Sequence, residues 1–300
     1  MYPFHISRST ALSSPVVLTD VVVSAGGRFR RRGKLGLKLH YGVPPLLELQ
    51  NVTVMRGEQP ALNNLSLRID AGEHVCILGP NGCGKSTLIK TITRECYPLA
   101  REGSAMRILG RERWDIFALR THLGIVSPDL LVSCTADSTG RDVVLSGFFS
   151  STRIFPHHHP DASHLARADD ALAQLGIMHL ADRPLMQMSS GEAKRTLIAR
   201  ALAHEPNTLL FDEPSSALDI AAQFQLRETM RDLARSGLAI LLVTHHVSEI
   251  IPEMERVILL RDGRILADGR TEQVLTAGNL QTLFRIEVRL ERSGGFFHLY

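Results

Sequence analysis

The clearest chemistry in this 300-residue sequence lies in one glycine-rich segment. Its residues follow the spacing G-x-x-x-x-G-K-S/T and read Gly79, Pro80, Asn81, Gly82, Cys83, Gly84, Lys85, Ser86 and Thr87. Glycines let the backbone curl so that successive N–H groups face one concavity and hold phosphate oxygens. The N-terminus of a following helix adds a favourable dipole. We therefore expect a nucleotide site in which Lys85 reaches the β- and γ-phosphates and Ser86 is a ligand of Mg²⁺.

Two adjacent carboxylates form the second candidate site. Asp212 and Glu213 follow the apolar run 209–211, and the carboxyl ends of such strands are where open α/β sheets bind ligands. Alone, this pair is more typical of a helix cap or a solvated turn. In a chain that also carries a phosphate loop, we expect Asp212 to bind Mg²⁺ and Glu213 to polarise an attacking water.

Three shorter motifs add a resemblance to a known family. Residues 188–192 (MSSGE) stand where ABC ATPases carry their LSGGQ signature, residues 215–219 (SSALD) resemble the D-loop of that family, and His245 ends an apolar strand in the place of its switch histidine. The five motifs follow the family's order between residues 46 and 269. The chain therefore resembles the ATP-binding subunit of an ABC transporter with a single cassette.

The resemblance implies a head-to-tail dimer that encloses ATP between the phosphate loop of one subunit and the signature of the other. It assigns nucleotide contacts to Ser189, Ser190, Gly191, Glu192 and Asp219, and a γ-phosphate contact to His245. The sequence agrees, because Ser189 and the N–H of Gly191 begin a predicted helix and form a second anion-binding terminus. Taken without the family, the same four residues from Ser189 are an N-capping turn.

The sequence departs from the family pattern at three places. Arg56 stands where the family has an aromatic residue that stacks on adenine, and a planar guanidinium can also stack on a base. Pro128 stands at the glutamine of the Q-loop, so that role is missing or is displaced to Ser127 or Asp129. In the signature, Ser190 replaces a glycine and Glu192 a glutamine.

The implied fold is an α/β P-loop NTPase of the ABC type, with a parallel core sheet, an N-terminal antiparallel β subdomain and an inserted helical subdomain. Local patterns point the same way. The alternation of Leu65, Leu67 and Ile69 favours a strand with one buried face, and residues 75–78 and 239–243 are short apolar runs. The patterns predict helices from Lys85, over 191–204 and over 221–236, which alternate with strands as in a parallel sheet.

We expect the ATPase domain to span residues 45–285, with its helical lobe at about 129–187. A basic extension, 1–44, precedes it and a hairpin-like tail, 286–300, follows it. The Arg and Ser content of the extension is also typical of transit segments, but no amphipathic helical stripe accompanies it, which favours a flexible extension.

Charge and hydropathy exclude two classes of protein. The net charge is +3, yet seven basic residues and one acidic residue lie in 1–44, which leaves 27 basic and 30 acidic residues in the rest. The body therefore lacks the basic surface of a nucleic-acid binder. No apolar run reaches about 18 residues, so we expect no membrane-spanning segment.

The resemblance thus implies a cytoplasmic ATPase, peripheral on the membrane, that binds ATP and Mg²⁺ and drives transport through separate permease subunits. In the family that the chain resembles, an ATPase on its own chain is the usual arrangement of importers. The short variant motifs at 189–192 and 244–246 resemble those of subgroups allied to the uptake of metals or metal chelates. Two alternatives stay open: an ABC ATPase that acts on ribosomes or DNA without transport, and a binding switch that scarcely hydrolyses. One cassette without coiled-coil heptads disfavours the first, and the presence of Glu213 and His245 disfavours the second.

Overall fold

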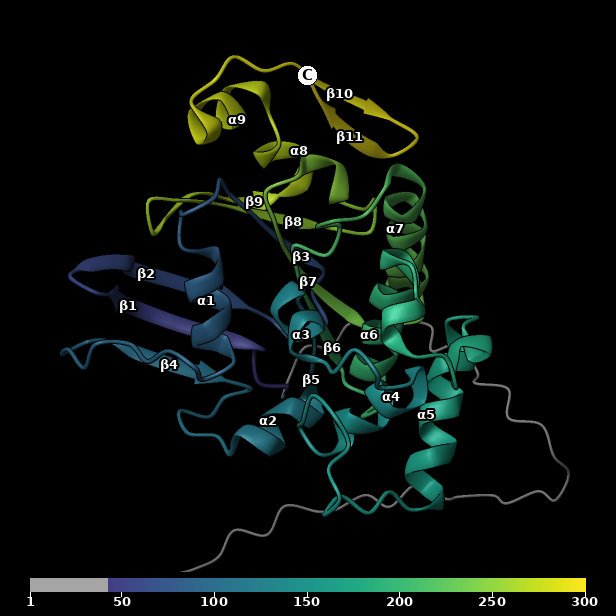
Figure 1. Cartoon of the computed structure of the whole chain (residues 1–300). Coiled ribbons are helices and arrows are strands. Elements are labelled where there is room, and N and C mark those ends of the chain that lie inside the picture. The colour runs from purple at the N-terminus through teal and green to yellow at the C-terminus, as the bar shows by residue number, and fades with distance from the viewer. Residues whose placement is uncertain (1–42) are drawn as a thin grey trace, which may run out of the picture. The chain divides into compact units, whose positions relative to one another are not determined.

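The computed structural model describes residues 43–300. Residues 1–42, which hold nearly all of the predicted basic extension, lie outside the described residues. Within the described part, Figure 1 shows a mixed sheet, an antiparallel sheet and a helical lobe. Their buried side chains form two hydrophobic cores.

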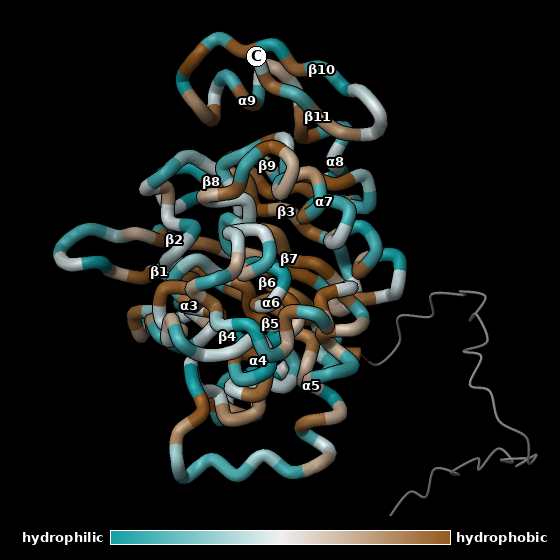
Figure 2. Tube along the Cα trace, turned by 45° about the vertical axis from the view of Figure 1, so that its right-hand side comes forward, coloured by the Kyte–Doolittle hydropathy of each residue, from teal (hydrophilic) through white to brown (hydrophobic). Residues whose placement is uncertain are grey.

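A six-stranded sheet in the order β5-β6-β7-β3-β8-β9 carries the fold. Its strands are β3 (Val75–Leu78), β5 (Leu123–Val126), β6 (Thr208–Asp212), β7 (Ala239–Thr244), β8 (Arg256–Arg261) and β9 (Arg264–Arg270). All neighbours pair in parallel except β8 and β9. Every residue of β3 and β7 is buried, as expected of parallel strands covered on both faces. Figure 2 shows the hydrophobic residues along these central strands, and the predicted parallel core is confirmed.

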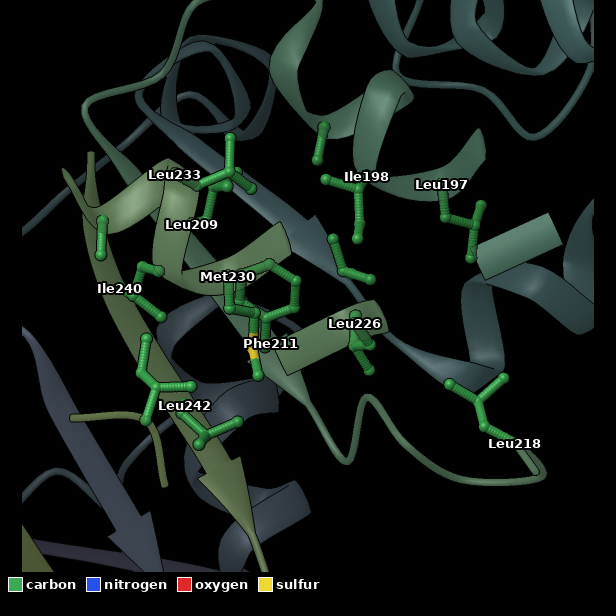
Figure 3. Close-up of a cluster of buried hydrophobic side chains, with 14 of the residues drawn as sticks. Leu197, Ile198, Leu209, Phe211, Leu218, Leu226, Met230, Leu233, Ile240 and Leu242 are labelled. Atoms are coloured by element: carbon green, nitrogen blue, oxygen red, sulfur yellow. The ribbon is translucent and has the colours of Figure 1, made fainter. Parts of the chain in front are cut away.

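Alternate side chains of the strands enter the two different cores, because successive residues point to opposite faces. On one face, Leu209, Phe211 and Leu242 pack against helices α6 (Ser190–Leu202) and α7 (Ile220–Arg235) (Figure 3). On the other face, Leu210 and Val243 pack with helix α1 (Lys85–Ile92). The sheet is therefore held between two layers, and α1 and α6 are fixed relative to its strands.

The predicted antiparallel subdomain is confirmed as a three-stranded sheet in the order β2-β1-β4. Its strands are β1 (Leu47–Arg56), β2 (Gln59–Ile69) and β4 (Ala105–Ile108). Leu65, Leu67 and Ile69 are buried while Ser66 and Arg68 are exposed, so β2 has the one buried face that its alternation predicts.

The inserted lobe is helical, as predicted. After α2 (Ile116–His122), it comprises α3 (Pro128–Ser133), α4 (Gly140–Phe148), α5 (Ala162–Gln174) and two 3-10 turns, Met178–Leu180 and Leu185–Gln187. Thr139 and Asp161 begin α4 and α5 with capping boxes. Helices α4 and α5 pack against α6 (Figure 1), and α6 therefore belongs to both the lobe and the core.

The C-terminal part consists of a 3-10 turn at Val247–Glu249, helices α8 (Thr271–Val274) and α9 (Ala277–Phe284), and a hairpin of β10 (Leu290–Ser293) and β11 (Phe296–Leu299). Gly294 and Gly295 form its turn with φ of 58° and 86°, values that favour glycine. Across residues 43–300, none of the helices combines the length and the apolar character that a bilayer span requires.

Candidate nucleotide-binding and hydrolysis site

The phosphate loop joins β3 to α1, as its sequence predicts. Gly84, just before α1, has φ of 111°, and a Cβ there would lie 2.5 Å from the carbonyl oxygen of Ala61. A Cβ at Gly79 would lie 2.3 Å from the carbonyl oxygen of Leu260. Both positions therefore require glycine. The N–H of Gly79 donates to the carbonyl of Thr244 (3.1 Å), which ties the loop to the end of β7.

Lys85 points back into this loop. Its side chain is only 4% exposed, and Nζ donates to the carbonyl oxygens of Gly79 (2.8 Å) and Pro80 (3.0 Å). An ammonium held by two backbone carbonyls is fixed in place, so its charge is preorganised for an anion at the loop.

Glu213 lies between two of the other predicted site residues. Its Oε1 is 3.4 Å from Lys85 Nζ and 3.2 Å from His245 Nδ1. Glu213 follows β6, His245 follows β7, and Lys85 lies in the segment after β3. These three strands lie side by side in the sheet, in the order β6-β7-β3. The parallel strands end at the same edge, and this brings a carboxylate, an ammonium and an imidazole together from positions far apart in the sequence.

The Asp212 carboxyl has a pKa well above the usual range of an aspartate. Burial and the nearby charges of Glu213 and Asp129 raise the pKa of Asp212 to about 6, while Lys85 and Lys194 act in the opposite direction. A cleft of about 520 Å³ is lined by Ser86, Asp129, Asp212 and Glu213, among others. Hydroxyl and carboxylate oxygens are the ligands that Mg²⁺ prefers, and three acidic side chains near one another favour a cation. The residues present therefore fit a magnesium ion.

The backbone of Glu213 is strained. Its φ is 42°, in the left-handed region that costs a non-glycine residue roughly 1–2 kcal/mol. Pro214 follows it, and a proline restricts the conformation of the residue before it. The N–H of Glu213 donates to the carbonyl of Val243 (2.8 Å). No sequence signal predicted this conformation.

At the Q-loop position, the structure separates the two residues that could replace the missing glutamine. Pro128 is the first residue of α3, and Ser127 is its N-cap, whose hydroxyl accepts from the N–H of Leu130 (3.2 Å). The Asp129 carboxylate makes no hydrogen bond or ion pair within residues 43–300, and it lines the cleft with Ser86. Asp129 is therefore the side chain that is free to act there.

The signature residues form a capping box at the start of α6. The N–H of Ser189 donates to Glu192 Oε2 (2.8 Å), and the N–H of Glu192 donates to the Ser189 hydroxyl (3.2 Å). The hydrogen bond from Ser189 lowers the pKa of Glu192. Neither these residues nor Ser190 and Gly191 line the cleft that contains Ser86. The N-capping interpretation is thus correct for the local structure, and the fold does not bring the signature to the cleft of its own chain.

The remaining predicted residues are spread around the site. Arg56 is exposed at the end of β1 and does not line the cleft. The Asp219 carboxylate caps α7 through the N–H of Ala222 (2.7 Å). Cys83 and Thr87 are buried, while Asn81 and Gly82 are exposed in the loop. The Cys83 side chain is 3% exposed and packs in the hydrophobic core beneath the loop. Burial raises the pKa of its thiol.

The fold and the site together define a P-loop NTPase of the α/β class. Comparison with known proteins identifies the family: the model described as "ABC transporter" matches residues 62–216. The hemin import ATP-binding protein HmuV of Plesiomonas shigelloides is 32% identical over 81% of this chain and 96% of its own length.

Solved structures agree with this family. An inward-facing, putative metal-chelate type ABC transporter matches with a TM-score of 0.68 and 27% identity, over 85% of this chain and 96% of that one. MJ0796, a bacterial ABC transporter cassette solved as a dimer, matches with a TM-score of 0.62 and 28% identity, over 75% and 98% of the two chains. The chain belongs to the ATP-binding subunits of ABC transporters. It is an ATPase with a single cassette.

Proposed function

We propose that Glu213 is the general base of ATP hydrolysis and that His245 and Lys85 orient the reacting groups around it. The observation that supports this most is the Glu213 carboxylate, held within 3.4 Å of Lys85 Nζ and 3.2 Å of His245 Nδ1. A carboxylate can take a proton from a water, Lys85 offsets the charge of the β- and γ-phosphates, and His245 contacts the γ-phosphate. Single-turnover hydrolysis by a Glu213→Gln chain tests this assignment.

Ser86 and Asp212 would hold Mg²⁺ beside the phosphates. When bound, the ion offsets negative charge on the β- and γ-phosphate oxygens. Ser86 is the second residue of α1 and Asp212 the last residue of β6, so each is fixed by a regular element. Asp129 would add a third oxygen from the helical lobe, in place of the glutamine that is absent.

Replacement of Asp129 by asparagine is expected to raise the Mg²⁺ concentration for half-maximal hydrolysis roughly tenfold, because a carboxylate that supports a metal site contributes about that much affinity. ATP binding without Mg²⁺ should be unchanged. Asp137→Asn is the matched control, since Asp137 is an exposed aspartate of the same lobe that does not line the cleft. The same Mg²⁺ dependence in both variants would exclude Asp129 from the site.

The site is proposed to be completed by a second copy of the chain, arranged head to tail. The cleft lacks residues 189–192 in its wall, although the N-terminus of α6 offers backbone N–H groups and a dipole suited to an anion. In the dimer, we propose, Ser189, Ser190, Gly191 and Glu192 face the γ-phosphate bound by the partner, and Asp219 lies at the same interface. Arg56 stacks on the adenine.

Two substitutions of Ser189 separate its capping role from phosphate contact. Ser189→Ala is expected to lower the free energy of unfolding by about 1 kcal/mol, and Ser189→Asp to restore it, since aspartate caps as well as serine. Urea denaturation measures this change. If Ser189 faces a phosphate, the Ser189→Asp variant should hydrolyse ATP more slowly than the wild type even though its stability is restored, because a carboxylate repels the γ-phosphate. Wild-type hydrolysis by Ser189→Asp would reduce Ser189 to a helix cap.

We infer that the dimer works at the cytoplasmic face of a membrane, bound to separate permease subunits, and that it drives import of a metal or a metal chelate. The relatives named for hemin import and for metal-chelate transport support this class of substrate. They do not favour an ATPase that acts on ribosomes or nucleic acid. Affinity purification of the tagged chain from its own membranes tests the proposal: a multi-span permease should be recovered in a stoichiometric amount, and recovery of ribosomes instead would contradict it.

A further inference from the structure

A buried glutamate that the proposed mechanism does not use lies behind the hydrolysis site. Glu249 ends the 3-10 turn Val247–Glu249, four residues after His245, and its side chain is 3% exposed. Its N–H donates to the carbonyl of His246 (3.2 Å). The position of Glu249 is therefore tied to the end of the segment that carries His245.

The Glu249 carboxylate binds the segment that carries Glu213. Its Oε1 accepts from the N–H of Ser215 (3.1 Å) and from the Ser215 hydroxyl. Ser215 is 7% exposed and comes two residues after Glu213. One carboxylate thus receives both donors of Ser215, and it connects the turn after β6 to the turn after β7.

This connection bears on the strained backbone at Glu213. The left-handed φ of 42° persists only where the surroundings over-determine it. The N–H of Glu213 itself donates to the carbonyl of Val243. Two residues further on, the N–H of Ser215 donates to the Glu249 carboxylate. The strained residue lies between two anchors, and without the second one the chain could relax toward an ordinary conformation and move the carboxylate away from His245.

A buried lysine, Lys194, interacts electrostatically with the Glu249 carboxylate. Lys194 on α6 is 3% exposed and forms no direct ion pair within the part of the chain that the structure describes. Burial lowers the pKa of Lys194, and the negative charges of Glu249 and Asp212 act in the opposite direction. Among the residues that the structure describes, Glu249 Oε2 has no hydrogen-bond partner although it is buried. Lys194 is therefore a buried cation that interacts electrostatically with Glu249 without pairing with it directly.

We propose that Glu249 is a positioning residue for ATP hydrolysis: by holding Ser215, it keeps Glu213 in its strained conformation beside His245. This inference rests on the proposed role of Glu213 as the base. Within the described residues, no hydrogen bond or ion pair joins Glu249 to the phosphate loop, residues 79–87. Its effect should therefore fall on kcat rather than on ATP binding.

The test measures kcat and the Kd for ATP in three variants of the full chain. Glu249→Ala removes the acceptor, and kcat should fall at least roughly tenfold, since a small misplacement of a catalytic group has a large effect on rate. Glu249→Gln keeps an oxygen that can accept from the Ser215 N–H, and should retain more activity than the alanine variant. Ser215→Ala loses only the hydroxyl, and its kcat should also lie between that of Glu249→Ala and that of the wild type. In all three, the Kd for ATP should stay within about threefold of the wild type, since the loop that binds phosphate is unchanged.

Glu253→Gln is the matched control. Glu253 is a half-buried glutamate four residues on, which pairs with Arg231 and Arg235 away from the site, and its variant should keep the wild-type kcat. An unchanged kcat in Glu249→Ala would overturn the proposal. So would an equal loss of kcat and ATP affinity, which indicates general disruption. If the alanine variant does not fold, the Glu249→Gln and Ser215→Ala chains decide the question by the same criteria.

Glu213→Gln is assayed in parallel to keep the two proposals apart. If that variant turns over at the wild-type rate, the role of Glu213 as the base is wrong, whatever Glu249 does. If it is inactive while Glu249→Ala is fully active, only the positioning role of Glu249 is wrong.

Discussion

A chain with Glu213 replaced by glutamine is expected to bind ATP but to hydrolyse it roughly 10²–10⁴ times more slowly, the range that a general base contributes. Glutamine has the shape of glutamate but cannot accept a proton at neutral pH. The substitution also removes a negative charge that lies 3.4 Å from Lys85 Nζ, beside the expected position of the γ-phosphate. The affinity for ATP should therefore be equal to that of the wild type or higher.

Rapid-quench measurement of product under single-turnover conditions checks this expectation, because it isolates hydrolysis from product release. Glu272→Gln is a suitable control, since Glu272 is an exposed glutamate at the start of α8. Turnover by Glu213→Gln within a few-fold of the control would show that another group accepts the proton.

Replacement of Lys85 by alanine is expected to weaken ATP binding roughly 10- to 100-fold, because a hydrogen bond to a charged group contributes about 1.5–3 kcal/mol. Lys85 is 4% exposed and donates to the carbonyls of Gly79 and Pro80. The substitution therefore removes the cation and also leaves two loop carbonyls without their donor, so the loop loses order as well as charge.

Thermal unfolding with and without ATP separates these effects. A ligand that binds only the folded state raises its unfolding temperature, and we expect such a rise for the wild type and hardly any for Lys85→Ala. The unfolding temperature without ATP reports the effect of the loop alone. A full ATP-dependent rise in the variant would refute the assignment of residues 79–87 as the phosphate loop.

The places of the candidate site residues in the fold could be predicted because each residue belongs to a short local pattern. The phosphate loop and the carboxylate pair of Asp212 and Glu213 are contiguous, and the apolar runs before them mark the strands that carry them. Parallel strands end at one edge of a sheet, so Lys85 and Glu213 were expected to lie near each other, and the family resemblance added His245 at the same edge. The predicted helices 191–204 and 221–236 differ from α6 and α7 by one or two residues at each end, where Ser189 and Asp219 set the first turns.

What could not be predicted depends on contacts between distant residues. Ser215 and Glu249 are 34 positions apart, and no spacing rule connects a serine in one turn to a glutamate in another. The same is true of Lys194, whose burial follows from the packing of α6. The sequence left Ser127 and Asp129 as equal candidates at the Q-loop position, and only the cap of α3 distinguishes them. The net charge of +3 says nothing of the site, because most of the basic excess lies in residues 1–44 and the cation that faces Glu213 is the single residue Lys85.

The molecular mass of the Glu213→Gln chain in solution, measured by light scattering with ATP and Mg²⁺ and again with ADP, directly tests whether two chains share the nucleotide site. If two chains enclose the nucleotide and Glu213 is the base, the variant cannot leave the ATP-bound state. It should then have twice the mass of one chain with ATP, with one nucleotide retained per chain, and the mass of a single chain with ADP. A single-chain mass in saturating ATP would contradict the shared site.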